Sequence, residues 1–225
     1  MINKDYIVIG AGIIGAAISR EIKKRNLGDV LVLEKESCFG EHASGRNSGV
    51  IHSGFNLSPG SLKARFCVEG SQMLRDYCLQ NNVDMVQCGT LVVARNDKEG
   101  YVLEELLQRG YQNQVHGLRI ISNSELKERE PEIEGKKALL SPTGAVVNSK
   151  QLLERIIQES IRGGVQYLTD SQVIAIERQM VVTSSDIYKA QHIINCAGLY
   201  ADKIAKMCGI KIDEFIIPFR GEYME

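Results

Sequence analysis

The sequence predicts an α/β fold in which a βαβ nucleotide-binding unit is interrupted by an α+β excursion. Three observations support this prediction: a glycine-rich turn between an apolar run and a helix within residues 1–35, buried strand patterns that return after residue 165, and mixed patterns between about residues 85 and 145. Because βαβ crossovers join parallel strands, the two strands of the first unit are expected to be parallel. The first unit is therefore Rossmann-like.

The expected elements follow the hydrophobic pattern. Continuous apolar runs at 6–9 and 30–33 are typical of strands buried on both faces, and residues 16–25 between them have helical spacing. Residues 39–61 are too rich in Gly, Ser and Asn to form a regular element. Further helices are expected at 62–82, 101–109, 151–162 and 200–207, with a short helix capped by Ser124. Further strands are expected at 87–95, 165–168, 173–177 and 192–195, with a hairpin at 138–147 and an antiparallel flap at 180–188. The strands at 165–168 and 173–177 have the pattern of a parallel sheet.

Composition limits the function classes. The 225 residues carry 27 Lys and Arg against 28 Asp and Glu, and a net charge of −1 gives no general attraction to nucleic acid or to anionic membranes. The longest weakly polar stretch, 6–18, is too short to span a bilayer, and we expect no transmembrane or targeting segment. The six scattered cysteines include no C-x-x-C pair, which favours a reducing, cytoplasmic location and predicts no metal site.

The strongest local motif is G-x-G-x-x-G, formed by Gly10, Gly12 and Gly15 at the junction of strand and helix. Such glycines allow a tight turn, close approach of a pyrophosphate and close packing of helix on strand. Glu34 follows 19 residues after Gly15, at the end of the second strand, where a carboxylate can accept the hydroxyls of an adenosine ribose. The motif predicts dinucleotide binding without choosing between NAD and FAD, and the acid disfavours a 2′-phosphate.

The stretch 44–52 is the second candidate for ligand contact. Small residues there allow close backbone approach, while Ser44, Arg46, Asn47 and Ser48 offer donors to a pyrophosphate or to a flavin edge. The alternative is a solvated surface loop. His52 is more ambiguous, because an isolated histidine is about as often structural as functional.

Several segments together resemble the D-amino-acid-oxidase superfamily of FAD-dependent oxidoreductases, and within it most closely the L-2-hydroxyglutarate oxidase/dehydrogenase group. The segments run through the chain in order: YIVIGAGIIG (6–15), VLEKE (32–36), SGRNSGVIHSGF (44–55), PGSLKARFCVEG (59–70), CGTLVVA (88–94), LLSPTGAVV (139–147), INCAGLYADKIA (194–205) and PFRGEY (218–223). The chain departs from that group at Arg46, where a histidine is common, and at 55–58, where an aromatic-rich segment is typical.

The resemblance implies FAD as the cofactor and assigns roles to residues. It implies a discontinuous FAD-binding domain at 1–84 and 146–212, and a partial substrate domain at 85–145 and 213–225, with a strand at 215–224. His52 would lie near the flavin and is the catalytic candidate. The implied cofactor-binding residues are Gly10, Gly12, Ile14, Gly15, Glu34, Lys35, Ser44, Arg46, Asn47, Ser48, Val173, Ala197 and Gly198.

The function implied by the resemblance is oxidation of a small 2-hydroxy acid, similar to 2-hydroxyglutarate, by hydride transfer to the flavin. An FAD-dependent glycerol-3-phosphate dehydrogenase or amine oxidase is the alternative within the superfamily, and a non-catalytic FAD-binding subunit is the alternative outside it. Relatives continue beyond PFRGEY, so we expect these 225 residues to be catalytically incomplete. A second polypeptide or self-association would then complete the flavin site.

Overall fold

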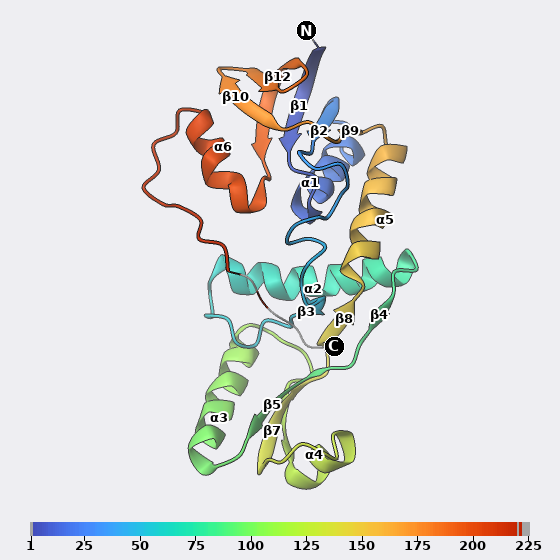
Figure 1. The fold of residues 1–225 in the computed structure, drawn as a ribbon. Helices are drawn as coiled ribbons and strands as arrows, with labels where there is room; N and C mark the ends of the chain where they lie inside the picture. Colours follow the sequence, from blue (N-terminus) through green and yellow to red (C-terminus); the bar gives the residue numbers. More distant parts are fainter. Residues whose placement is uncertain (1, 220, 222–225) are drawn as a thin grey trace. The chain divides into compact units, whose positions relative to one another are not determined.

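The computed structural model describes residues 2–219 and 221 (Figure 1). The chain divides into two compact units, unit 1 (Met1–Asn47 and Ser149–Glu225) and unit 2 (Ser48–Asn148). These compact units do not follow the domain division expected from the resemblance, because residues 48–84 include a strand and a helix that pair with or contact strands of unit 2. Compactness does not report on cofactor contact, so the functional assignment of 48–84 stays a prediction.

Unit 1 is built on a six-stranded sheet with the order β10-β11-β12-β1-β2-β9. Its strands are β1 (Ile2–Ile9), β2 (Val30–Leu33), β9 (Gln166–Leu168), β10 (Val173–Glu177), β11 (Met180–Thr183) and β12 (Ile187–Asn195). The four strands β12, β1, β2 and β9 are parallel neighbours, and β10 and β11 extend the sheet in antiparallel pairs. All four parallel strands therefore end at one edge of the sheet.

Helices cover both faces of this sheet. Side chains of a strand alternate between the two faces, so each face has its own core cluster. The helices of unit 1 are α1 (Ile13–Lys24), α5 (Ser149–Arg162), the 3₁₀ turn η1 (Gly198–Tyr200) and α6 (Ala201–Met207). Val8 and Val32 pack with Ile22 of α1, and α1 packs in turn against α5. On the other face, Ile7 and Ile204 of α6 share a second core cluster.

Unit 2 contains two three-stranded antiparallel sheets, ordered β3-β8-β4 and β5-β7-β6. Leu103 of α3 and Leu139 of β7 belong to its larger core cluster, and Leu126 of α4 belongs to a second cluster. In chain order its elements are β3 (Val50–Ile51), α2 (Leu62–Gln80), β4 (Met85–Val86), β5 (Thr90–Ala94), α3 (Asp97–Gln112), β6 (Arg119–Ser122), α4 (Asn123–Arg129), β7 (Lys137–Ser141) and β8 (Ala145–Val147).

The predicted βαβ unit and the α+β excursion are confirmed, but the hairpin expected in the excursion and the irregular loop expected at 39–61 are not. The strand expected at 87–95 is β5, and the short strand β4, which precedes that range and belongs to a different sheet, was not predicted. The break between β4 and β5 includes Gly89, whose φ of +79° suits glycine and whose N–H donates to the carbonyl of Gly144. The hairpin expected at 138–147 is absent, because β7 and β8 are joined by a turn at 142–144 but belong to separate sheets. The loop expected to lack regular structure contains the short strand β3.

Unit 1 corrects three further expectations. The strand β10 at 173–177 pairs antiparallel with β11 and not in parallel. The flap residues 187–188 and the strand 192–195 form one strand, β12, because β1 extends to Ile2 and pairs with β12 along its length. Residues 215–219 of the strand expected at 215–224 form no strand; residue 221 is likewise irregular, and the others lie outside the described residues.

Candidate functional site

The glycine turn connects β1 to α1 in a conformation that only glycine fits. Gly10 has a φ of +103°, and a Cβ on Gly15 would lie 2.0 Å from the carbonyl oxygen of Gly10. Gly12 is the N-cap of α1 and contributes no side-chain cap, and the first turn of α1 contains no acidic residue. Free N–H groups and the positive end of the helix dipole therefore face the site, as an anion requires.

Ser44 closes this turn from the loop that follows β2. Its Oγ accepts a hydrogen bond from the Ile13 N–H at 2.9 Å, and a Cβ on Gly12 would lie 2.9 Å from the same oxygen. A hydroxyl that accepts one bond can still donate its own proton. Ser44 can therefore cap α1 and donate to a phosphate at the same time, which agrees with its predicted role.

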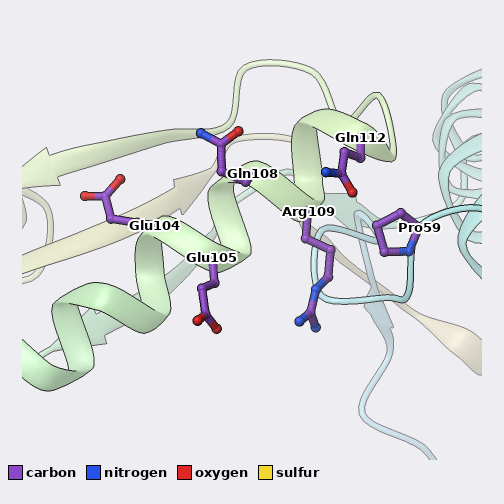
Figure 2. A pocket seen from close by; sticks show the side chains of 6 residues that line it. All are labelled: Pro59, Glu104, Glu105, Gln108, Arg109 and Gln112. Carbon is purple, nitrogen blue, oxygen red and sulfur yellow. The ribbon is translucent and has the colours of Figure 1, made fainter.

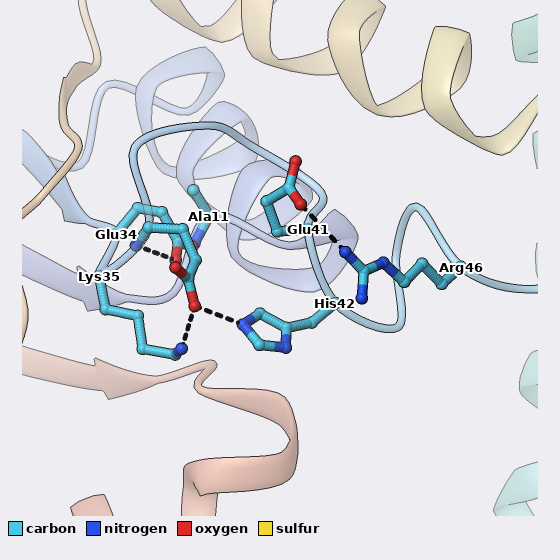
Figure 3. A network of polar contacts seen from close by, with 7 residues as sticks. Ala11, Glu34, Lys35, Glu41, His42 and Arg46 are labelled. Atoms are coloured by element: carbon cyan, nitrogen blue, oxygen red, sulfur yellow. Dashed lines mark hydrogen bonds and ion pairs between the residues drawn. The ribbon is translucent and has the colours of Figure 1, made fainter. Parts of the chain in front are cut away.

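Glu34 is buried at the end of β2 and is tied to the glycine turn (Figure 3). Its carboxylate accepts from the N–H of Ala11 at 2.9 Å and from the N–H of Glu36 at 3.1 Å. A carboxylate has about four acceptor positions, so two remain for ribose hydroxyls. Besides the ribose contact that the sequence predicts, Glu34 fastens the glycine turn to β2.

Sequence reasoning missed a polar cluster beside Glu34. Glu36 accepts hydrogen bonds from the ammonium group of Lys35 and from Nε2 of His42, the latter at 2.8 Å (Figure 3). The Lys35 hydrogen bond, followed by that of His42, holds the pKa of Glu36 below its ordinary value. The Tyr200 ring lies 4.7 Å from Lys35 Nζ and packs edge-on against His42 at 6.0 Å. The consecutive charged residues 34–36 could have indicated this cluster from the sequence. The contribution of Tyr200 could not have been found this way, because Tyr200 is distant in the chain.

The remaining predicted residues of unit 1 lie at the same edge with different surroundings. Arg46 pairs with Glu41 at 3.1 Å on the surface, and its phosphate contact stays a prediction (Figure 3). The Asn47 amide donates to the carbonyls of Ala43 and Ser44, both at 3.0 Å, and so positions Ser44.

Four other predicted residues occupy the ends of elements. Ile14 is exposed in the first turn of α1, and Val173 is the buried first residue of β10. Ala197 and Gly198 follow the end of β12, where the Ala197 N–H donates to Oδ1 of Asn195 at 3.2 Å. Gly198 has a φ of +53° with open space at its Cβ position.

Ser48 and His52 belong to unit 2, where His52 follows β3 and is exposed. The backbone around it is held by two contacts. The Cys67 thiol donates to the His52 carbonyl at 3.5 Å, and the Ser141 hydroxyl donates to the buried Ser53 hydroxyl at 2.7 Å. The imidazole is thus carried by a fixed backbone and is accessible from solvent.

Unit 2 also carries an open groove of about 420 Å³ along α3 (Figure 2). Two of its charged groups are already engaged: Lys137 pairs with Glu104 at 3.0 Å, and Arg109 donates to the Asn56 carbonyl at 3.2 Å. The groove contains none of the predicted site residues. It is lined by Pro59, Glu104, Glu105, Gln108, Arg109 and Gln112.

Two features are absent from the described residues. No group of three or more His, Cys, Asp or Glu in that part of the chain is arranged to hold a metal ion. None of the helices described combines the length and the apolar character needed to cross a bilayer.

Comparison with known proteins decides the family. The model of the family described as FAD dependent oxidoreductase (DAO) matches residues 5–225. The chain belongs to this family. FAD-dependent oxidoreductase is therefore confirmed as the predicted class and FAD as the predicted cofactor.

Curated relatives of this DAO chain carry two names. The L-2-hydroxyglutarate dehydrogenase of Indibacter alkaliphilus is 41% identical over 97% of the chain and 56% of its own length. The mitochondrial L-2-hydroxyglutarate dehydrogenase of Homo sapiens is 36% identical over 98% of the chain and 51% of its own length. A glycerol 3-phosphate dehydrogenase of Caloramator mitchellensis is 36% identical over 97% of the chain and 46% of its own length. The chain thus spans about half the length of these relatives.

Solved structures agree with the DAO fold. The dithionite-reduced L-α-glycerophosphate oxidase of Mycoplasma pneumoniae, solved with FAD bound, superposes with a TM-score of 0.86 at 27% identity. The match covers 92% of this chain and 57% of that one. The likeness confirms the predicted fold class.

Proposed function

We propose that this chain is the FAD-binding part of an oxidoreductase that oxidises a small 2-hydroxy acid similar to 2-hydroxyglutarate. The observation that carries the proposal is the identity of 36–41% to L-2-hydroxyglutarate dehydrogenases over nearly the whole chain. The tie between Glu34 and the glycine turn supports the nucleotide half of the proposal.

The roles assigned to the cofactor site are part of this proposal. The glycine turn with Ile14 would hold the pyrophosphate at the start of α1, and Glu34 and Lys35 would contact the ribose side. Ser44, Arg46, Asn47 and Ser48 would line the phosphates and the flavin. Val173 would offer backbone to the adenine, and Ala197 and Gly198 would close on the cofactor. We retain 1–84 and 146–212 as the cofactor-binding part, and 85–145 and 213–225 as part of the substrate domain.

FAD, when bound, accepts the hydride that leaves the substrate carbon. The residues of the chain position the two partners, exclude water and move the hydroxyl proton. His52 is the proposed base, because an imidazole can take a proton near neutral pH and because its ring is exposed on a backbone held by Cys67.

Glycerol 3-phosphate is the second candidate substrate. It is supported by the Caloramator relative at 36% identity and by the glycerophosphate oxidase structure at 27%. Both candidates are oxidised at a carbon that bears a hydroxyl group, so the proposed base serves either reaction. They differ in the anionic group that the enzyme must recognise.

We further propose that turnover requires residues from a second polypeptide or a second copy of the chain. The support is a run of exposed apolar side chains in the irregular segment after α6, including Phe215 at 68%, Ile217 at 58% and Phe219 at 92% exposure. Exposed apolar surface of this kind is typical of a binding interface. Without such a partner, the chain would be a non-catalytic FAD-binding protein.

Six free thiols support a cytoplasmic location, although the human relative is mitochondrial.

Anaerobic reduction of the bound flavin tests the substrate proposal. The complete enzyme that contains this chain is loaded with FAD, and bleaching of the absorbance band at ~450 nm is followed after mixing with each substrate, which reports hydride transfer directly. L-2-Hydroxyglutarate should bleach the band fastest, with D-2-hydroxyglutarate as the matched control. Faster bleaching by glycerol 3-phosphate would transfer the assignment to the second candidate. If FAD binds and no substrate bleaches it, the chain is a binding protein only.

A further inference from the structure

The sheet order of unit 1 brings three chain segments to one place. Because β12, β1 and β2 are parallel neighbours, the residues that follow them leave the sheet at the same edge. The glycine turn follows β1, Lys35 follows β2 and Tyr200 follows β12. Lys35 Nζ lies 4.7 Å from the Tyr200 ring centroid, so this contact joins the two segments that flank the glycine turn.

A second ammonium group lies against the same ring. Nζ of Lys203, on α6, is 5.0 Å from the Tyr200 centroid. Both distances refer to one centroid, so the two ammonium groups lie within about 10 Å of each other, about one Debye length at 0.1 M salt. A cation near the face of a tyrosine ring is attracted by the ring, which holds it without neutralising it.

The charges at this edge explain why an additional cation is useful. Glu34 and Glu36 place two carboxylates beside the glycine turn, and both would repel a diphosphate. Lys35 is paired with Glu36. Among the residues that the structure describes, no ion pair involves Lys203, so its charge is available to a ligand.

We propose that Lys203, held by the Tyr200 ring, is an electrostatic partner of the FAD diphosphate. This inference rests on the proposed function, since it takes the glycine turn as the pyrophosphate site. The ribose contact requires the carboxylate of Glu34. Lys203 offsets the negative charge of Glu34, and Lys35 offsets the negative charge of Glu36. Tyr200 is a positioning residue that acts through Lys203.

The test measures binding of FAD, ADP and adenosine to the full chain and to K203Q. The matched control is K206Q, which removes the same charge one turn further along α6, where Lys206 is also exposed. At low salt K203Q should bind FAD and ADP about three- to fivefold more weakly than K206Q does, the size of an exposed charge interaction. The difference should shrink in 0.5 M NaCl, and adenosine, which has no phosphate, should bind equally to both variants.

Two further variants separate charge from structure. K203R should restore FAD affinity, and Y200L should weaken FAD binding more than Y200F, because Phe keeps a ring for the cation. Equal FAD affinities for K203Q and K206Q, or an equal loss of adenosine binding, would overturn the role of Lys203. Failure of the unmodified chain to bind FAD would instead refute the proposed function.

Discussion

Removal of the Glu34 carboxylate should damage the apoprotein as well as the cofactor site. Ala11 is fully buried, and its N–H donates to Glu34. Glu34→Ala leaves this donor without a partner, which costs about 1–3 kcal/mol. For a chain of this length, 1 kcal/mol lowers the melting temperature by about 2–4 °C, so the apoprotein should melt roughly 2–12 °C lower. Glu34→Gln should be intermediate, because a carboxamide has one oxygen for the two N–H donors that Glu34 now serves.

Thermal unfolding of the apoproteins and fluorescence titration with FAD measure the two effects separately. The control is Glu154→Ala, since Glu154 is exposed on α5, and a surface change of this kind shifts stability by no more than about 0.5 kcal/mol. Loss of the ribose contact should weaken FAD binding by a further 1–3 kcal/mol or so. If Glu34→Ala melts and binds FAD as the unmodified chain does, both roles of Glu34 are wrong.

Three further predictions follow from the geometry. Gly15→Ala places a Cβ 2.0 Å from the Gly10 carbonyl oxygen, so FAD binding should be lost and the melting temperature should fall; an unchanged titration would contradict the need for glycine there. Gly70→Ala should stabilise the chain by about 0.5–1 kcal/mol, because Gly70 lies inside α2 with nothing within 4 Å of the new Cβ; a lower urea midpoint would contradict this. The Arg119 hydrogen bond holds the pKa of Glu125 at about 2, so this carboxylate stabilises the fold above its ordinary pKa of 4.5 and ceases to do so as the pH falls towards 2. Glu125→Gln should therefore lower the urea midpoint at pH 6 but not at pH 2, and an equal effect at both would contradict it.

The nucleotide part of the fold could be predicted from sequence because its signals are local. The two buried strands, the glycine spacing and Glu34 lie within one βαβ unit, and the structure has all of them in register. The excursion was predicted only in outline. Two short apolar runs with a turn between them indicate a hairpin, yet β7 and β8 join different sheets, and no local pattern specifies which distant strand each one pairs with.

The candidate site shows the same limit. Ser44 could be selected by its residue type, but its bond to the Ile13 N–H is a contact across 31 residues that the sequence does not encode locally. Tyr200 and Lys203 could not be predicted, because their place beside Lys35 depends on β12 and β2 flanking β1. Arg46 could be selected by residue type as a phosphate partner, but its ion pair with Glu41 could not be predicted from the sequence pattern.

Titration of the purified chain with FAD tests the central claim most directly. The flavin fluorescence of FAD is followed as protein is added, and NAD is then added as competitor. We expect saturable binding of one FAD per chain that Glu34→Ala weakens, since the glycine turn and the buried carboxylate act together. NAD should not displace it, since the chain belongs to a family of FAD dependent oxidoreductases. Absence of FAD binding, or displacement of FAD by equimolar NAD, would contradict the account.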